Sequence, residues 1–199
     1  MTYHLGVDVG TTYTAAAVGR HTRAEAVGLG TRSVSVPTIV SMADEQFLVG
    51  EPAARRAITD PQRVAREFKR RVGDPTPLLL GGSPLAAELL MARVVRWVVD
   101  QVAVTEGEPP SSLAVTHPAN WGEFKLDLLC QALRHAGVPA DHLVPEPVAA
   151  ATSYDDLAEG GEVTFQDFSA AWSAADVPPN DPTLQTFLTA FFGCATRGG

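Results

Sequence analysis

The chain has 199 residues, of which 45% are hydrophobic, and its 15 basic and 23 acidic residues give a formal net charge of −8 at pH 7. This acidic balance argues against nonspecific binding to nucleic acid, and the hydrophobic fraction is typical of a globular chain rather than a disordered one. The two cysteines lack the spacing of a metal site, no signal-peptide pattern opens the chain and no apolar run reaches membrane-spanning length, so we expect a cytoplasmic protein that does not bind membranes.

The first predicted element is a hairpin of two short apolar strands over residues 5–18. Alternation along the first strand places the Asp8 carboxylate on the opposite face from the valines beside it. Gly10 can adopt backbone angles closed to other residues, and Thr11 and Thr12 offer the N–H and hydroxyl donors that a phosphate needs. The carboxylate can hold a hydrated Mg²⁺ against such a phosphate. Taken alone, these residues favour a phosphate site and an ordinary polar hairpin about equally, because short glycine motifs often arise by chance.

The next segment contains a meander followed by two predicted helices. Strands are predicted over residues 24–29, 33–42 and 47–50, and a helix over residues 51–57. Asp60 followed by Pro61 is a good start for a second helix, which we expect to continue to about Arg71 and to end at Gly73. The cations of its last turn suit the helix dipole, so the local sequence makes Lys69 a solvated charge rather than a catalytic lysine.

The second half of the chain alternates helices with strands. The longest helix is predicted from Ser83 to about Val104, and a buried strand over residues 113–116. Asn120, with Glu123 three residues later, has the pattern of a capping box and predicts a helix. The residues expected to form the apolar face of that helix are Trp121, Phe124, Leu128 and Ala132. A meander followed by alternating strands and helices indicates an α/β fold with a mixed sheet.

A strand at Leu143–Val144 then leads into Glu146, which lies between two prolines. The prolines leave this glutamate little backbone freedom. It forms either a rigid turn with a solvated charge or a carboxylate that points into a site, and a short helix of small residues follows it.

Several segments, in the right order, resemble motifs of the nucleotide-binding domain of the Hsp70 (DnaK-like) chaperone family, within the actin-like ATPase superfamily. The segments are residues 6–13, 36–40, 49–53, 68–73, 115–138 and 145–151. The resemblance covers residues 3–157 and implies that residues 1–157 form the first lobe of an actin-like ATPase (RNase H-like) fold, a mixed β-sheet with flanking helices.

The resemblance also implies roles for individual residues. Asp8 would order Mg²⁺ or its water shell, and Lys69 would neutralise charge that develops on the transferred phosphoryl group. Glu146 would orient the attacking water or a metal-bound water, and Pro118 would lie at the interdomain switch that couples nucleotide state to a partner domain. The residues that would hold the β- and γ-phosphates of ATP are Gly10, Thr11, Thr12 and Tyr13.

The sequence departs from the family pattern in two places, after Glu146 and in the helix that follows Pro118. Where a second, glycine-rich phosphate motif is expected, residues 167–172 read Asp-Phe-Ser-Ala-Ala-Trp, whose Cβ atoms would hinder a close approach of phosphate to the backbone. Leu126 stands where the family usually has an arginine, with Lys125 beside it. We therefore expect residues 158–199 to be a divergent tail, a truncated or frame-shifted start of a second lobe.

The resemblance thus implies a fragment of an Hsp70-like chaperone ATPase domain, an ATP hydrolase that uses ATP and Mg²⁺, with hydrolysis impaired by loss of the second lobe. The partners it implies are ATP and ADP, and co-chaperones or client proteins through further domains, but neither nucleic acid nor membrane. Two alternatives stay open. One is a non-catalytic interaction module or remnant that no longer binds ATP, and the other is a different actin-superfamily protein, such as a sugar kinase or a cytoskeletal protein.

Overall fold

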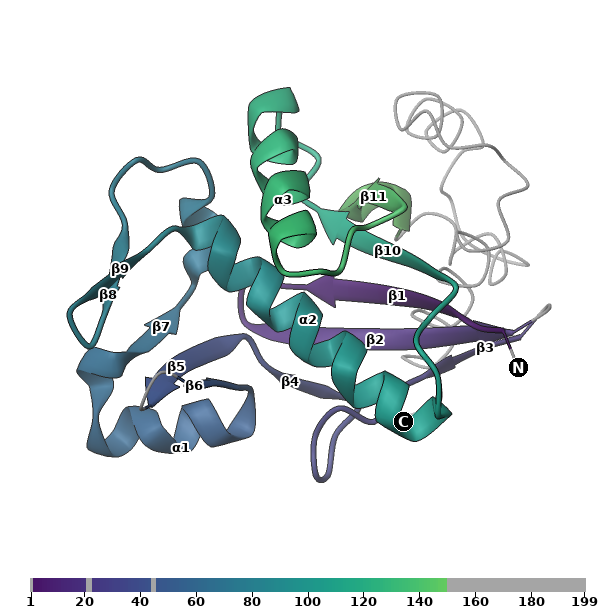
Figure 1. The fold of residues 1–199 in the computed structure, drawn as a ribbon, viewed down its shortest axis with the longest axis horizontal. Helices are drawn as coiled ribbons and strands as arrows, with labels where there is room; N and C mark the ends of the chain where they lie inside the picture. The colour runs from purple at the N-terminus through teal and green to yellow at the C-terminus, as the bar shows by residue number, and fades with distance from the viewer. Residues whose placement is uncertain (1, 21–22, 44–45, 150–199) are drawn as a thin grey trace, which may run out of the picture.

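The centre of the computed structural model, which describes residues 2–20, 23–43 and 46–149, is a six-stranded mixed sheet (Figure 1). Its strands are β1 (His4–Val9), β2 (Tyr13–Arg20), β3 (Arg23–Ala26), β4 (Ser35–Pro37), β10 (Ser112–His117) and β11 (His142–Pro145). The order is β11-β10-β1-β2-β3, and β4 also pairs with β2. β1 is antiparallel to β2 but parallel to β10, which is in turn parallel to β11. The predicted α/β class with a mixed sheet is confirmed.

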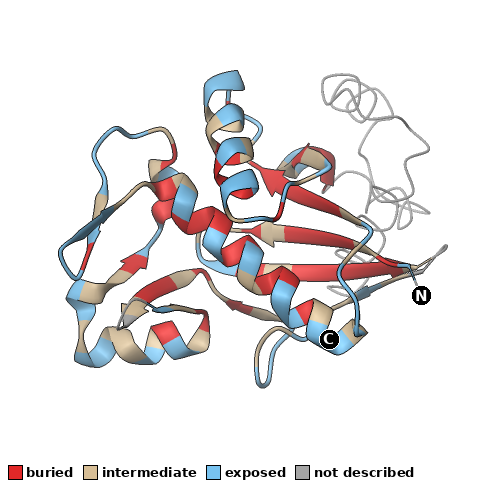
Figure 2. Ribbon diagram, viewed as in Figure 1, coloured by how far each residue is buried: buried red, intermediate tan, exposed pale blue. Residues whose placement is uncertain are grey.

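Two helices pack against this sheet, α2 (Ala87–Glu106) and α3 (Glu123–His135). The longer one, α2, runs across the strands, and buried residues lie on its sheet side and along β1, β2 and β10 (Figure 2). Its charged residues Arg93, Arg96 and Asp100 are all exposed, and Arg96 donates a hydrogen bond to Asp100. Among the described residues, no helix is both long and apolar enough to cross a membrane.

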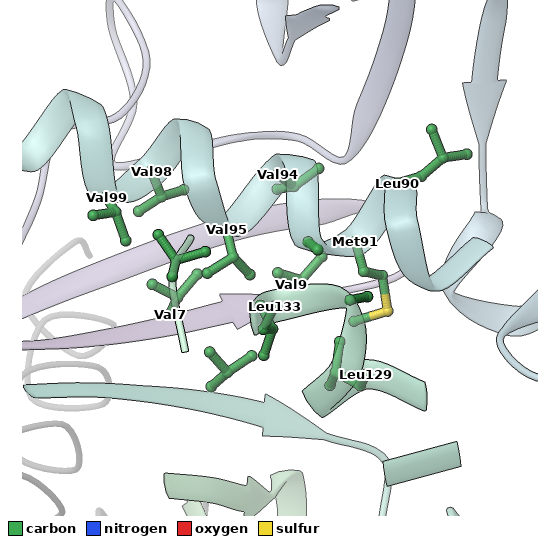
Figure 3. Packing of buried hydrophobic residues seen from close by; sticks show 14 of the residues in the cluster. Val7, Val9, Leu90, Met91, Val94, Val95, Val98, Val99, Leu129 and Leu133 are labelled. Carbon is green, nitrogen blue, oxygen red and sulfur yellow. The ribbon is translucent and has the colours of Figure 1, made fainter. Parts of the chain in front are cut away.

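The hydrophobic core lies where α2, α3 and β1 meet (Figure 3). Branched aliphatic side chains dominate it, and burying each contributes about 1.5–3 kcal/mol. The residues labelled in Figure 3 are Val7 and Val9 of β1, Leu90, Met91, Val94, Val95, Val98 and Val99 of α2, and Leu129 and Leu133 of α3. Because Val7 and Val9 face the helices, Asp8 between them is directed away from this core.

A smaller unit lies beside the central sheet (Figure 1). It contains a three-stranded sheet of β5 (Ile39–Ala43), β6 (Gln46–Val49) and β7 (Val64–Arg66), and a hairpin of β8 (Leu78–Leu80) and β9 (Ser83–Leu85). Its helices are α1 (Glu51–Thr59) and two 3₁₀ turns, η1 (Pro61–Arg63) and η2 (Phe68–Arg71). The predicted strand over residues 33–42 is divided at Thr38 between the two sheets.

The helix predicted from Asp60 to Arg71 does not form. Instead η1, β7 and η2 follow one another, because the middle of the segment pairs antiparallel with β5, with Ala65 opposite Val40. Glu67 then adopts the left-handed conformation, φ 52°, that turns the chain from β7 into η2. Tertiary pairing has overridden good local helix signals. Similarly, α2 begins at Ala87 rather than at Ser83, because residues 83–85 pair with β8.

The helix predicted from Asn120 begins later, at Glu123, with Gly122 as its N-cap and no side-chain capping bond, so the predicted capping box is wrong. Trp121 lies in the preceding turn, where its backbone N–H donates a hydrogen bond to the carbonyl of Pro118 at 3.1 Å. The predicted apolar face is also wrong in part. Phe124 is 67% exposed, and the residues that α3 buries are Leu129, Ala132 and Leu133, whose spacing of three and four matches one helix face. The predicted tail, residues 158–199, lies outside the described residues.

The two faces of α3 differ enough to be tested by mutation. Leu129→Ala is expected to lower the free energy of unfolding by about 2–5 kcal/mol, because Leu129 is 0% exposed and its removal opens a cavity in the core. Phe124→Ala is the matched control and should change it by less than about 0.5 kcal/mol. Urea denaturation followed by circular dichroism measures both. Equal losses would show that the buried face of α3 has been assigned wrongly.

Candidate functional site

The site forms where the parallel strands β1, β10 and β11 end. Their carboxyl ends point to the same side (Figure 1), and ligands commonly bind at such an edge of an α/β sheet. The register pairs Val7 with Val115 and His117 with Pro145, which brings Asp8, Thr116 and Glu146 to neighbouring positions. The hydroxyl of Thr116 donates a hydrogen bond to Oδ1 of Asp8.

The turn after β1 requires glycine. The N–H of Gly10 donates to the carbonyl of Tyr13 at 3.0 Å, and a Cβ at position 10 would lie only 2.5 Å from that oxygen. The turn is also anchored from outside, because the carbonyl of Thr12 accepts a hydrogen bond from the N–H of Thr38 at 2.8 Å. A buried bond of 2.9 Å between the hydroxyls of Thr14 and Thr38 adds to this anchor. The backbone donors of the turn are therefore held in fixed positions.

Lys69 and Glu146 form an ion pair across the site. Lys69 lies in η2 and is only 4% exposed, whereas Glu146, the residue after β11, is half-buried. The buried neighbours Phe68 and Val72 hold η2 against the core. The local sequence favoured a solvated charge for Lys69, and that interpretation is wrong, because the segment folds inward as a 3₁₀ turn instead of ending an exposed helix.

These groups surround one cavity of about 420 Å³. Its lining residues are Asp8, Gly10, Thr11, Lys69, Arg70, Pro118, Asn120, Trp121, Lys125 and Glu146. Six of the eight residues that the sequence singled out therefore meet in one place. The other two, Thr12 and Tyr13, lie in the same turn but do not line the cavity, and Tyr13 is 58% exposed.

Four lining residues were not predicted as site residues: Arg70, Asn120, Trp121 and Lys125. Asn120 and Trp121 had been assigned to a helix, and only their position in a turn brings them to the cavity. The His-Pro-Ala-Asn sequence is a turn signal that would have indicated this. Lys125 lies in the first turn of α3, and nothing in its local sequence points to a site.

Burial changes the pKa of two groups, Asp8 and His117, and in each case it favours the uncharged form. Burial raises the pKa of Asp8 above its ordinary value of 3.8, and the hydrogen bond from Thr116 and the charge of Lys69 offset this only in part. Burial lowers the pKa of His117, the last residue of β10, below its ordinary value of 6.5. His117 stacks on Trp121 with ring centroids 6.4 Å apart, and its Nδ1 lies 3.0 Å from the carbonyl of Pro118. Of these two groups Asp8 lines the cavity, and a desolvated titratable group in a cavity is characteristic of functional sites.

Comparisons with known proteins identify the family to which the chain is related. The sequence model of the Hsp70 protein family matches residues 4–77. The chaperone protein DnaK of Elusimicrobium minutum is 34% identical over 178 residues, which cover 87% of this chain and 29% of that protein. The DnaK proteins of Endomicrobium trichonymphae and Methanothermobacter thermautotrophicus are 31% and 29% identical, again over 87% of this chain. The chain belongs to the Hsp70 family. It spans about 29% of the length of these relatives.

Membership of the Hsp70 family assigns the fold. The mixed sheet with its flanking helices is the first lobe of an actin-like ATPase fold, as the sequence predicted. The cavity lies at the carboxyl ends of the parallel strands of this lobe.

Gly10→Ala should destabilise the turn, because the new Cβ would meet the carbonyl oxygen of Tyr13 at 2.5 Å. We expect a loss of about 1–3 kcal/mol in the free energy of unfolding, the usual range for overpacking. Gly28→Ala is the matched control, since a Cβ there would have no atom within 4 Å. Thermal unfolding compares the two variants, and equal stabilities would contradict the close approach at Gly10.

Asp8→Asn should raise the melting temperature of the free protein at neutral pH. Because the pKa of Asp8 is higher in the folded than in the unfolded state, ionised Asp8 costs stability at all pH values above its folded pKa. The gain from asparagine should therefore be full above that pKa and should shrink as the pH falls toward 3.8. Thermal unfolding across this pH range tests the sign. Asp127→Asn, at an exposed position on α3, is the control, and an Asp8→Asn variant less stable than wild type at pH 7 would contradict the prediction.

Proposed function

We propose that the cavity binds the phosphates of ATP together with Mg²⁺, and that the chain acts as the phosphate-binding part of an Hsp70-type chaperone ATPase domain. The observation that supports this most is the meeting of Asp8, Lys69 and Glu146 in one cavity, although they come from three different elements. A cavity with a tight glycine turn, a buried ammonium and carboxylates is the kind of site that phosphoryl transfer requires.

The turn of residues 10–13 would provide the phosphate donors. Gly10 and Thr11 line the cavity, and the anchoring of the turn to Thr38 keeps its backbone in place without a bound ligand. The N–H of Gly10 already donates to the carbonyl of Tyr13, so Gly10 would allow a phosphate to approach the backbone closely and Thr11 would supply the donors. Thr12 and Tyr13, at the exposed side of the turn, would reach the phosphates through backbone N–H groups or side chains. Fixed donors bind an anion with little cost of reorganisation.

The residues present fit a magnesium ion bound through water. Asp8 is a half-buried carboxylate that lines the cavity, and the Thr116 hydroxyl contacts only one of its oxygens. Among the described residues, no three His, Cys, Asp or Glu side chains gather as a metal site. Mg²⁺ usually keeps several waters and binds through one or two carboxylates plus substrate phosphates, so a single aspartate suffices. The ion would supply positive charge beside the phosphates.

Lys69 and Glu146 would carry out the protein's part of hydrolysis. The Lys69 ammonium, buried and oriented by Glu146, would stabilise negative charge on the transferred phosphoryl group. The half-buried Glu146 has a second carboxylate oxygen that can accept a hydrogen bond from water and orient it for attack. Because Ser169, Ala170 and Ala171 replace the glycines of a second phosphate motif, we propose that this hydrolysis is slow.

The remaining parts of the proposal follow from the relatives. The matched proteins are named chaperone proteins, so co-chaperones and client proteins are the proposed protein partners and the cytoplasm is the proposed location. Pro118 lines the cavity directly after β10, which suits a switch that senses the nucleotide. A non-catalytic interaction module is the alternative function, and the following experiment separates the two.

Calorimetric titration with Mg·ATP tests the proposal. Wild type is expected to bind with micromolar affinity, and Asp8→Ala should weaken binding by at least about tenfold, since a charge-assisted contact contributes about 1.5–3 kcal/mol. Asp127→Ala, which removes an exposed carboxylate from α3, should bind like wild type. Absence of heat with wild type would overturn the proposal and favour the interaction module.

A further inference from the structure

The chain uses lysine at only two positions, Lys69 and Lys125, and both line the cavity. The other 13 basic residues are arginines. The two lysines come from unrelated elements, η2 of the small unit and the first turn of α3. A lysine ammonium is a compact charge with three rotatable donors, which differs from the rigid planar fork of arginine. The cavity therefore has a cationic chemistry that the rest of the chain lacks.

Lys125 differs from the other cations of the cavity in its partners. Lys69 is paired with Glu146, and Arg70 donates a hydrogen bond to Glu67 at 2.9 Å. Within the part of the chain that the structure describes, no carboxylate lies within 4 Å of the Lys125 ammonium. Its contact is the Trp121 ring, whose centroid lies 5.9 Å from Nζ. The ring attracts the cation without neutralising it.

The side chain of Lys125 is positioned along its length. A Cβ placed on Gly73 would lie 3.3 Å from Cγ and 3.4 Å from Cε of Lys125, so the methylene stem packs directly on the Gly73 backbone. Trp121, which is buried and stacked on His117, holds the other end. A long side chain held at its stem and at its head loses less conformational entropy when it binds a ligand.

We propose that Lys125 is a second phosphate-binding lysine, whose ammonium donates hydrogen bonds to oxygens of the terminal phosphate of a bound nucleotide and of inorganic phosphate. The proposal rests on the proposed function and adds a ligand-binding residue to that site. Lys69 would contact the phosphate from the side of η2 and Lys125 from the side of α3. A phosphate between them would supply the negative charge that Lys125 lacks.

The scarcity of lysine allows a direct chemical test. In the Arg134→Lys variant, the lysine introduced at position 134 is an exposed amine on α3 and does not line the cavity. This variant is acetylated with an amine-reactive ester, with and without Mg·ATP or inorganic phosphate, at matched ionic strength. At ten times its Kd, either ligand should slow acetylation of Lys125 about tenfold, because the amine then reacts mainly in the free protein. Peptide mass spectrometry measures both rates.

The outcomes separate the inference from the proposed function. Protection of Lys125, with unchanged acetylation at position 134, supports the inference. Calorimetric binding of Mg·ATP by wild type without protection of Lys125 overturns the inference and leaves the proposed function standing. Protection by inorganic phosphate without any binding of Mg·ATP supports the anion site and overturns the proposed function. If neither ligand protects Lys125 and Mg·ATP also gives no calorimetric binding, both the inference and the proposed function are overturned.

Binding by variants provides a second, independent measurement. Lys125→Gln should raise the Kd for Mg·ATP about tenfold, as expected for the loss of one charge-assisted hydrogen bond, while Lys125→Arg should recover part of that loss. Arg134→Gln removes one charge from the same helix away from the cavity and should leave the Kd unchanged. Equal melting temperatures of the variants would exclude misfolding as the cause. If Lys125→Gln and Arg134→Gln lose affinity equally, the loss comes from the change in net charge alone, and the inference is overturned.

Discussion

The ion pair between Lys69 and Glu146 connects the two units of the described structure, and both partners line the cavity. An ammonium that is 4% exposed requires a counter-charge, because an isolated buried charge costs several kcal/mol. Replacing such pairs by apolar residues often leaves a protein as stable or more so. The pair is therefore better explained by what its charges do at the cavity than by stability.

The position of each partner follows from packing around it. Phe68 and Val72 are buried on either side of Lys69, so η2 cannot shift without disturbing the core beneath α2. Glu146 follows β11, whose register with β10 is fixed by three more pairs besides that of His117 with Pro145. Regular elements thus hold both charges, and sites built on such elements are more precisely positioned than sites built on free loops.

The sequence predicted those parts of the fold whose signals are local. Alternating valines around Asp8 and the glycine turn predicted the first hairpin, because its two strands are neighbours in the sequence and pair with each other. The segment from Asp60 to Arg71 was predicted wrongly, because pairing with β5 decides its structure and no local pattern reports that pairing. The cavity residues that were singled out from the sequence are those in segments that resemble motifs of the Hsp70 family. Lys125 was not predicted to line the cavity, because its contacts with Trp121 and Gly73 arise only in the tertiary fold.

Electrostatics link the cavity to the stability of the chain. Desolvation is the main cause of the pKa shifts of Tyr3, Asp8 and His117. The hydroxyl of the buried Tyr3 donates a hydrogen bond to the carbonyl of Glu108, so Tyr3 is part of the folded core and not of the site. The other two lie at the site, where the ionised Asp8 carboxylate is held in an environment that disfavours its charge. A cation that binds beside Asp8 would relieve this cost, and a phosphate that binds beside Lys125 would supply a missing counter-charge. The desolvated Asp8 and the Lys125 ammonium are therefore the features of the free cavity that a bound magnesium phosphate, as proposed, would complement.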